Sequence, residues 1–301
     1  MIRFSKYLKS CILVLFAIVF LMPQQIEAQR KKKLKKEAVE TPIAPVPKKK
    51  KEKKLSDFIK SSKEIEGLFK IYQETITGSL QMLISESQLN KEYIHFHQIS
   101  NGASDAGRMR GHYRGSKVFK IKKYFNKIEF VTQNTSFYFD PDIAISKSAE
   151  DNISEGVMAS LKVEFYDKKN HQYLIKADDL FLKETFAQIK PSRRPGQKPT
   201  DFSLGSLDKN KTKINAINNY PENTNLTIEY VYSQPSVLNA GSNALADGRN
   251  VSISVYHSLM AMPEDDYEIR LDDPRVGYFI TQVDDKTSTS SAPYRDLVHR
   301  W

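Results

Sequence analysis

The stretch LTIEYVY, residues 226–232, sets apolar and aromatic side chains at alternate positions: Leu226, Ile228, Tyr230 and Tyr232. Side chains two residues apart on a β-strand point to the same face, so the stretch predicts a strand with one buried face. The stretch VSISVYH, residues 251–257, repeats the pattern with Val251, Ile253, Val255 and His257. The loop GSNALADG, residues 241–248, lies between them, and we expect the two strands to form a hairpin or an adjacent pair in one sheet.

Further alternating stretches on either side of this pair predict a mostly β protein (α+β), with antiparallel sheets and a few short helices. The strands that we expect are 68–73, 80–84, 93–99, 118–125, 127–132, 136–139, 161–166, 172–176, 275–283 and 294–301. The last two should extend the sheet formed by 226–232 and 251–257. Short helices are expected from Ser56, a good N-cap residue, to the stop at Gly67, and over 178–186, with a turn or short helix over 85–90.

Composition divides the chain into segments. Residues 1–28 read as a signal peptide, with Arg3, Lys6 and Lys9 ahead of an apolar run and Ile26-Glu27-Ala28 as a cleavage site. An uncleaved membrane anchor is the alternative. Residues 29–54 are a Lys-rich and Pro-spaced linker, which we expect to be disordered. The folded body, 55–301, is interrupted by KPSRRPGQKPTD, 190–201, which either separates subdomains 55–189 and 190–301 or forms a long loop.

The net charge of +10 is concentrated outside the folded body. Residues 29–54 hold twelve Lys and Arg against three Asp and Glu, whereas residues 55–301 hold 31 against 32. A nucleic-acid-binding domain needs a basic face on its folded part, so nucleic acid is not an expected partner. The Lys-rich linker can make weak contact with an anionic membrane or envelope polymer.

The predicted signal peptide indicates an exported protein, in the periplasm, associated with the outer membrane or secreted. The one cysteine, Cys11, lies within the predicted signal peptide. The mature chain would then hold no disulfide, no thiolate nucleophile and no cysteine-ligated metal.

The C-terminal run RLDDPRVGYFITQVDDKTSTSSAPYRDLVHRW, 270–301, carries the most specific signature. Its heptapeptide DPRVGYF, 273–279, and the later His299-Arg300-Trp301 resemble the secreted bacterial zinc-dependent metalloproteases of the metzincin type. The resemblance covers most of 55–301 and includes these further motifs: Gly67-Leu68-Phe69, Phe202-Ser203-Leu204, Leu207-Asp208-Lys209 and Tyr220-Pro221-Glu222-Asn223-Thr224.

The resemblance implies an N-terminal accessory region that precedes a catalytic domain. The catalytic motif of such enzymes, His-Glu-x-x-His, binds zinc through two imidazoles on one helical face. None of the six histidines here is followed by Glu, so we expect no cofactor in this chain and no proteolysis by it alone. Zinc would belong to the catalytic domain, the expected partner. The residues expected to contact that domain are Asp273, Arg275, Tyr278, His299, Arg300 and Trp301, although Asp273 could simply cap a turn and Arg275 could pair with Asp272.

Two other groups of residues are candidates for binding. The glycine-rich loop 101–116 carries Arg108, Arg110 and Arg114, which would suit a peptide or an anionic glycan if the chain were a self-sufficient envelope binding module. The alternative is a mobile surface loop. His95 and His97 share a strand face and could hold zinc, but a half-exposed polar face is the expectation, and His257 is expected to be a hydrogen-bonded core or edge histidine.

Overall fold

The computed structural model describes residues 54–149, 151, 153–264 and 266–299, which belong to one compact unit, Lys53–Trp301. The predicted signal peptide and nearly all of the predicted linker lie outside the described residues. Among the described residues, no helix is both long enough and apolar enough to cross a membrane.

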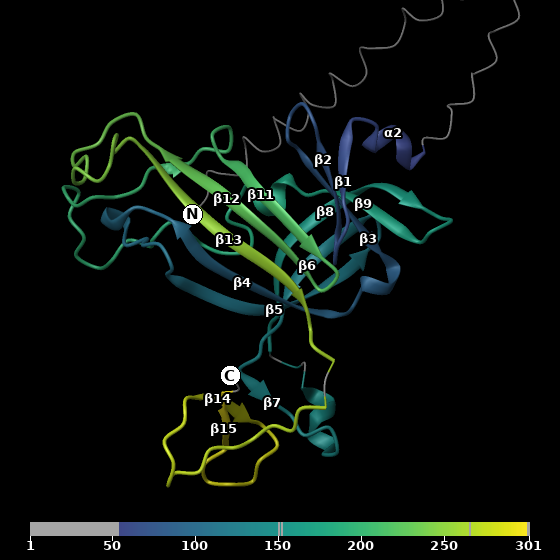
Figure 1. Cartoon of the computed structure of the whole chain (residues 1–301). Helices are drawn as coiled ribbons and strands as arrows, with labels where there is room; N and C mark the ends of the chain where they lie inside the picture. The colour runs from purple at the N-terminus through teal and green to yellow at the C-terminus, as the bar shows by residue number, and fades with distance from the viewer. Residues whose placement is uncertain (1–53, 150, 152, 265, 300–301) are drawn as a thin grey trace, which may run out of the picture. The chain divides into compact units, whose positions relative to one another are not determined.

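Most strands belong to one antiparallel twelve-stranded sheet (Figure 1). In hydrogen-bonded order they are β1 (Ser62–Ile65), β2 (Lys70–Glu74), β3 (Leu80–Ser85), β9 (Gln172–Lys176), β8 (Gly156–Asp167), β6 (Lys127–Thr132), β5 (Tyr113–Tyr124), β4 (Glu92–Asn101), β13 (Asn250–Ala261), β12 (Asn223–Ser233) and β10 (Ser206–Leu207), with β11 (Lys213–Tyr220) also paired to β12. The β12–β13 pair sets Tyr230 opposite Ile253, which confirms the pairing expected from the two alternating stretches.

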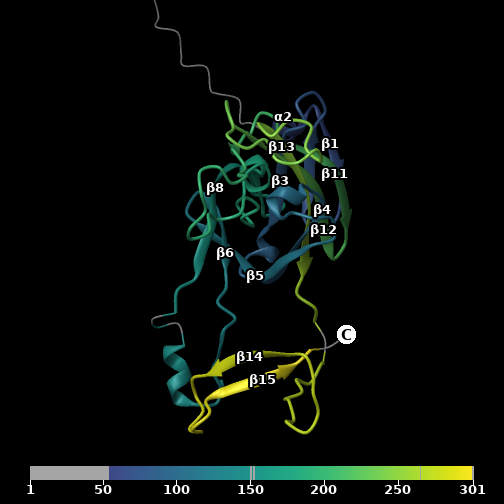
Figure 2. The same ribbon diagram turned by 90° about the vertical axis from the view of Figure 1, so that its left-hand side faces the viewer.

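A second, three-stranded sheet contains the last strands of the chain. It consists of β15 (Tyr294–Val298), β14 (Ile280–Asp285) and β7 (Phe137–Tyr138), and β14 lies beside β15 in antiparallel register (Figure 2). The prediction that the final strands extend the larger sheet is therefore wrong. β14 pairs with the two-residue strand β7, in which Phe137 lies opposite Asp284, and no local pattern indicates a pairing over such a distance in sequence.

The helices are short. The α-helices of the described residues are α2 (Leu55–Ile59) and α3 (Asp178–Phe181), and 3-10 turns occupy η1 (Glu86–Gln88), η2 (Ser104–Ala106) and η3 (Ala144–Ser148). The helix expected from Ser56 to Gly67 is thus only partly correct. It begins at Leu55, where the Asp57 carboxylate accepts the Lys54 backbone N–H at 2.8 Å, and the chain then pairs with β2 as β1.

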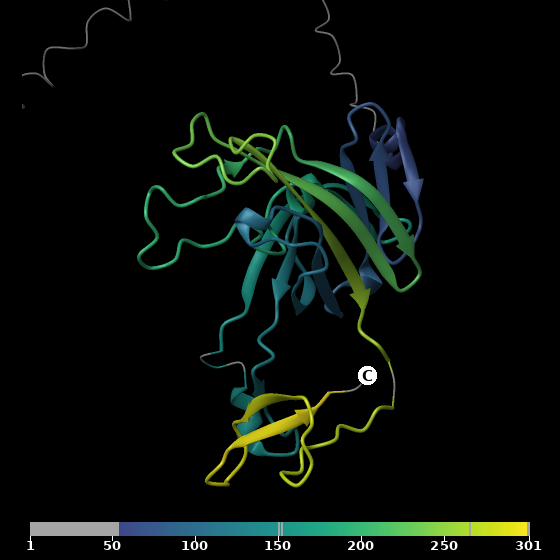
Figure 3. The ribbon, with the colours of Figure 1, turned by 60° about the vertical axis from the view of Figure 1, so that its left-hand side comes forward.

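The larger sheet curls, so that the start of β2 approaches the β11–β12 hairpin (Figure 3). Two of the motifs that carry the resemblance meet at this junction. The Leu68 N–H donates to the Tyr220 carbonyl at 2.7 Å, and the Phe69 N–H donates to Thr224 Oγ1 at 3.2 Å. These contacts join segments about 150 residues apart, so both motifs have a structural role in closing the sheet.

The junction also explains why residue 67 is a glycine. Asn219 Nδ2 donates to the carbonyls of Ile65, at 3.0 Å, and Phe69, at 2.7 Å. A Cβ at Gly67 would lie 2.1 Å from Asn219 Oδ1, far inside van der Waals contact. Any side chain at this position would displace the asparagine and break both hydrogen bonds.

One apolar core fills the inside of the curled sheet. Side chains from strands at both ends of the strand order share it, among them Ile71 of β2, Phe119 of β5 and Leu226 of β12, each fully buried. Burial of each such side chain contributes roughly 1.5–3 kcal/mol. Strands from before and after the 190–201 segment, such as β4 and β13, are direct neighbours in this sheet, so the segment is a loop within one sheet-forming body.

The prediction of a mostly β protein with antiparallel strands and a few short helices is confirmed, with helix as a minor part. The strands expected at 118–125 and 127–132 pair as the hairpin β5–β6, and those expected at 161–166 and 172–176 pair as β8–β9. The predicted strand 275–283 is wrong in its first half, because β14 begins only at Ile280.

Candidate functional site

The three-stranded sheet carries the residues expected to contact a catalytic domain. Few apolar side chains hold it together, and Val283 and Asp285 are the buried residues of β14. The Asp285 carboxylate accepts hydrogen bonds from Arg295 Nε, at 2.7 Å, and from the Thr287 hydroxyl, at 2.6 Å. The Arg295 guanidinium lies 3.8 Å above the Tyr138 ring, so one ion pair and one cation–π contact join β14, β15 and β7.

Hydrogen bonds from Thr287 and Arg295 lower the pKa of Asp285 to about 2. The carboxylate therefore stays ionised and paired throughout the physiological range. This polar cluster orients the small sheet in place of a hydrophobic core.

Asp273 and Arg275, both expected contact residues, pair with each other. Arg275 Nε donates to Asp273 Oδ1 at 2.9 Å, and the Arg275 backbone N–H bonds to the same oxygen at 3.0 Å. The Val276 N–H donates to the Asp273 carbonyl at 2.8 Å, so Asp273 caps a tight turn. An Asp side chain that bonds its own backbone two residues on competes with strand pairing, which explains the late start of β14.

Two of the other predicted contact residues, Tyr278 and His299, are exposed to solvent. The Tyr278 side chain is 50% exposed, and His299 Nε2 lies 2.8 Å from the Thr281 hydroxyl. Arg300 and Trp301 lie outside the described residues.

A set of large apolar side chains is exposed on and beside the small sheet. We call it the C-terminal apolar set, and its members are Ile269, Leu271, Val276, Tyr278, Phe279, Ile280 and Tyr294. Phe279 is 75% exposed and Ile269 is 64% exposed. Scattered exposed apolar residues are ordinary, but seven within 26 residues of sequence form a concentration of the kind found at interaction surfaces.

The three arginines of loop 101–116 do not share one environment. Arg108 is buried, and its Nε donates to the Ile189 carbonyl at 2.7 Å. This guanidinium links two loops and supports the fold. Arg110 and Arg114 are exposed.

Three histidines of the larger sheet form a buried cluster. His95 is 0% exposed, His97 is 6% exposed and His257 is 1% exposed, so the expected half-exposed polar face is wrong. The face of β4 that carries His95 and His97 points into the curled sheet, and β13 places His257 directly opposite His97. The expectation of a hydrogen-bonded core histidine at 257 is confirmed.

A single direction of hydrogen bonding follows from the atoms at the end of the cluster. Tyr230 Oη donates to the Phe181 carbonyl at 3.1 Å, so it must accept the hydrogen bond from His257 Nε2, which is 3.1 Å away. His257 Nδ1 is then the acceptor for His95 Nε2–H at 3.0 Å. The imidazoles of His95 and His257 are therefore both neutral, and these hydrogen bonds fix the tautomer of each.

Burial favours the neutral form of all three rings. Desolvation, with smaller contributions from neighbouring charges, lowers the pKa of His95 to about 2, of His97 to about 4 and of His257 to about 3. Among the described residues, neither His95 Nδ1 nor His97 Nδ1 has a hydrogen-bond partner. Across the described part of the chain, no three or more His, Cys, Asp or Glu side chains are arranged to hold a metal ion.

Comparison with known proteins adds one finding. Residues 111–301 match a family described as Domain of unknown function (DUF5117). That description states no activity. No curated protein and no solved structure matches the chain.

Proposed function

We propose that this chain, which belongs to the DUF5117 family, is the non-catalytic accessory region of an exported zinc-dependent protease of the metzincin type, the class of enzyme that its motifs resemble. Its role would be to pack against the catalytic domain, or to assist the folding of that domain. Zinc and the general base would reside in the catalytic domain, because residues 1–301 contain no His-Glu-x-x-His.

The observation that carries this proposal is the C-terminal apolar set. It lies within residues 269–294, inside the stretch whose motifs resemble the protease family, and it surrounds a sheet that buries few apolar side chains of its own. Exposed apolar area of this kind is stabilised by burial against a partner, at about 25 cal/mol per Å². The predicted signal peptide supports export.

Site-specific photo-crosslinking in the native host tests the docking role. A benzophenone amino acid at Tyr278 should yield an adduct whose peptides include a His-Glu-x-x-His sequence by mass spectrometry. The matched control is the same amino acid at Ile76, an 87% exposed residue outside the small sheet, which should yield no such adduct. Equal adducts at both positions, or a Tyr278 adduct without that motif, would refute the proposal.

A protease assay tests the assignment of chemistry. The purified protein, incubated with unfolded casein and Zn²⁺, should show no cleavage that a chelator abolishes. Chelator-sensitive cleavage that persists through repeated purification would place the active site in this chain and contradict the accessory role.

A further inference from the structure

Two adjoining cavities flank the proline-rich loop 190–204 of the larger body. Their volumes are about 590 Å³ and about 250 Å³. Arg193, Gln197, Asp201 and Ser203 line both, so the cavities share a wall. The combined space is in the range typical of ligand-binding clefts.

The shared wall is held by hydrogen bonds at its ends. The Lys190 N–H donates to Glu184 Oε1 at 2.7 Å, and Lys190 Nζ donates to the Gly205 carbonyl at 2.6 Å. The buried Arg108 holds the residue that precedes Lys190 through the Ile189 carbonyl. Three prolines within residues 190–201 restrict the backbone further.

The opposite wall comes from the loop between β12 and β13. Asn239 Nδ2 donates to the Thr200 carbonyl at 3.1 Å, and Gln234 Nε2 donates to the Ser203 carbonyl at 3.0 Å. These bonds connect the two walls directly.

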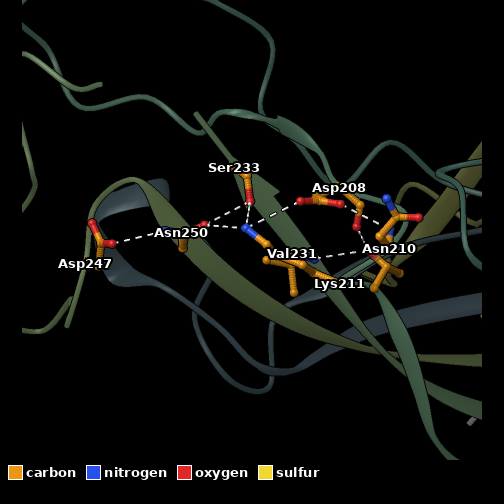
Figure 4. Close-up of polar contacts among 8 residues, drawn as sticks. Asp208, Asn210, Lys211, Val231, Ser233, Asp247 and Asn250 are labelled. Carbon is orange, nitrogen blue, oxygen red and sulfur yellow. Dashed lines mark hydrogen bonds and ion pairs between the residues drawn. The ribbon is translucent and has the colours of Figure 1, made fainter. Parts of the chain in front are cut away.

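A polar network fixes the ends of the strands from which this loop departs (Figure 4). Lys211 Nζ donates to Ser233 Oγ at 3.0 Å and to Asn250 Oδ1 at 2.8 Å, and it pairs with Asp208 at 3.4 Å. Asn250 Nδ2 in turn donates to Asp247 Oδ2 at 3.0 Å. Both ends of the 234–249 loop are therefore positioned before any ligand arrives.

The acidic side chains that line the cavities have hydrogen-bond partners, whereas several of the basic side chains have none. Asp105 accepts hydrogen bonds from the backbone N–H and hydroxyl of Ser242, and Asp201 accepts the Lys198 N–H at 2.8 Å. The guanidinium groups of Arg193 and Arg194 and the ammonium group of Lys198 have no ion pair or hydrogen bond with another described residue, and all three residues are exposed to solvent. The unpaired charge of the cleft is thus positive, and the two guanidinium groups are planar forks suited to carboxylates.

We propose that the two cavities form one cleft that binds a peptide segment bearing carboxylate side chains, with Arg193 and Arg194 each gripping a carboxylate. The Ser203 and Ser236 hydroxyls also lack partners among the described residues and can bond to peptide groups. A glycan is less suited, because sugar rings bind against aromatic faces and Phe202 is the one aromatic residue among those that line the cleft. This site is independent of the docking surface on the small sheet.

The test is fluorescence anisotropy of the full protein with labelled tetraglutamate, and with tetraglutamine as the neutral probe. Tetraglutamate should bind at least tenfold more tightly than tetraglutamine, and the double variant Arg193→Gln/Arg194→Gln should raise its Kd at least tenfold. The matched control is Arg110→Gln/Arg114→Gln, which removes the same charge from exposed positions outside the cleft and should change Kd less than twofold. The Lys-rich linker contributes the same background in every variant.

Three results would overturn the cleft. Equal weakening in the two double variants would mean non-specific attraction, and equal binding of the two peptides would remove the role of carboxylates. Binding of a polyuronate oligosaccharide at least tenfold more tightly than tetraglutamate, with sensitivity to the Arg193/Arg194 variant, would show that the ligand class is a glycan. Since neither arginine has a structural partner, the variant should keep the wild-type melting temperature, which circular dichroism checks.

Discussion

Acidification from pH 7.5 to 5.5 should destabilise this protein through its buried histidines. Each of the three rings has a pKa of about 4 or lower in the folded protein, against about 6.5 in the unfolded chain. Below pH 6.5 these histidines are protonated in the unfolded state but stay neutral in the folded state. Their contribution to the free energy of unfolding is therefore complete above pH 6.5 and is lost as the pH falls below it.

The magnitude follows from linkage. Between pH 7.5 and 5.5 each histidine lowers the free energy of unfolding by about 1.4 kcal/mol, so the three together lower it by about 4 kcal/mol. That loss is a large part of the roughly 5–15 kcal/mol by which a domain is usually stable. Carboxylates whose pKa is lowered, such as Asp285, lose their contribution only at lower pH, outside the interval.

Urea unfolding at several pH values, followed by circular dichroism, measures this dependence. The variant His97→Leu removes one of the three buried rings and should reduce the pH slope by about a third. The control His112→Gln changes an exposed histidine and should leave the slope unchanged. A free energy of unfolding that stays constant within 1 kcal/mol (the order of one buried ring's contribution) between pH 7.5 and 5.5 would refute the assignment of three neutral, buried imidazoles.

Three further outcomes are expected. Gly67→Ala should cost about 1–3 kcal/mol by displacing the asparagine that covers it, whereas Gly277→Ala, with open space around the new methyl, should be close to neutral in chemical denaturation. Arg108→Met should lower the free energy of unfolding by about 1–3 kcal/mol, because it leaves the Ile189 carbonyl without its hydrogen-bond donor. The control Arg110→Met, at an exposed position, should change it by less than about 0.5 kcal/mol, and equal losses in the two variants would contradict the difference in burial. Asp285→Asn should speed hydrogen exchange in β14 and β15 without moving the melting midpoint of the larger sheet; unchanged exchange would show that the ion pair does not hold the small sheet.

Candidate functional residues were harder to place from sequence than strands. The three arginines of loop 101–116 look equivalent in the sequence, yet Arg108 is buried against Ile189 while Arg110 and Arg114 face solvent. In the sequence, the cleft residues Arg193 and Arg194 stand out only as part of the proline-rich segment 190–201. This segment lines a cleft only because the 234–249 loop, from another part of the chain, packs against it.

The alternation of side chains along 226–232 and 251–257 was enough to predict two strands and their pairing, because the two-residue period is a property of the local backbone. Hairpins such as β5–β6 were predictable for the same reason, since their partners are adjacent in sequence. Only the tertiary structure decided that the sheet curls and turns the His95 and His97 face inward, and that β14 pairs with β7 in a separate sheet. Both results depend on contacts between residues more than 100 positions apart, which a local pattern of side chains does not encode.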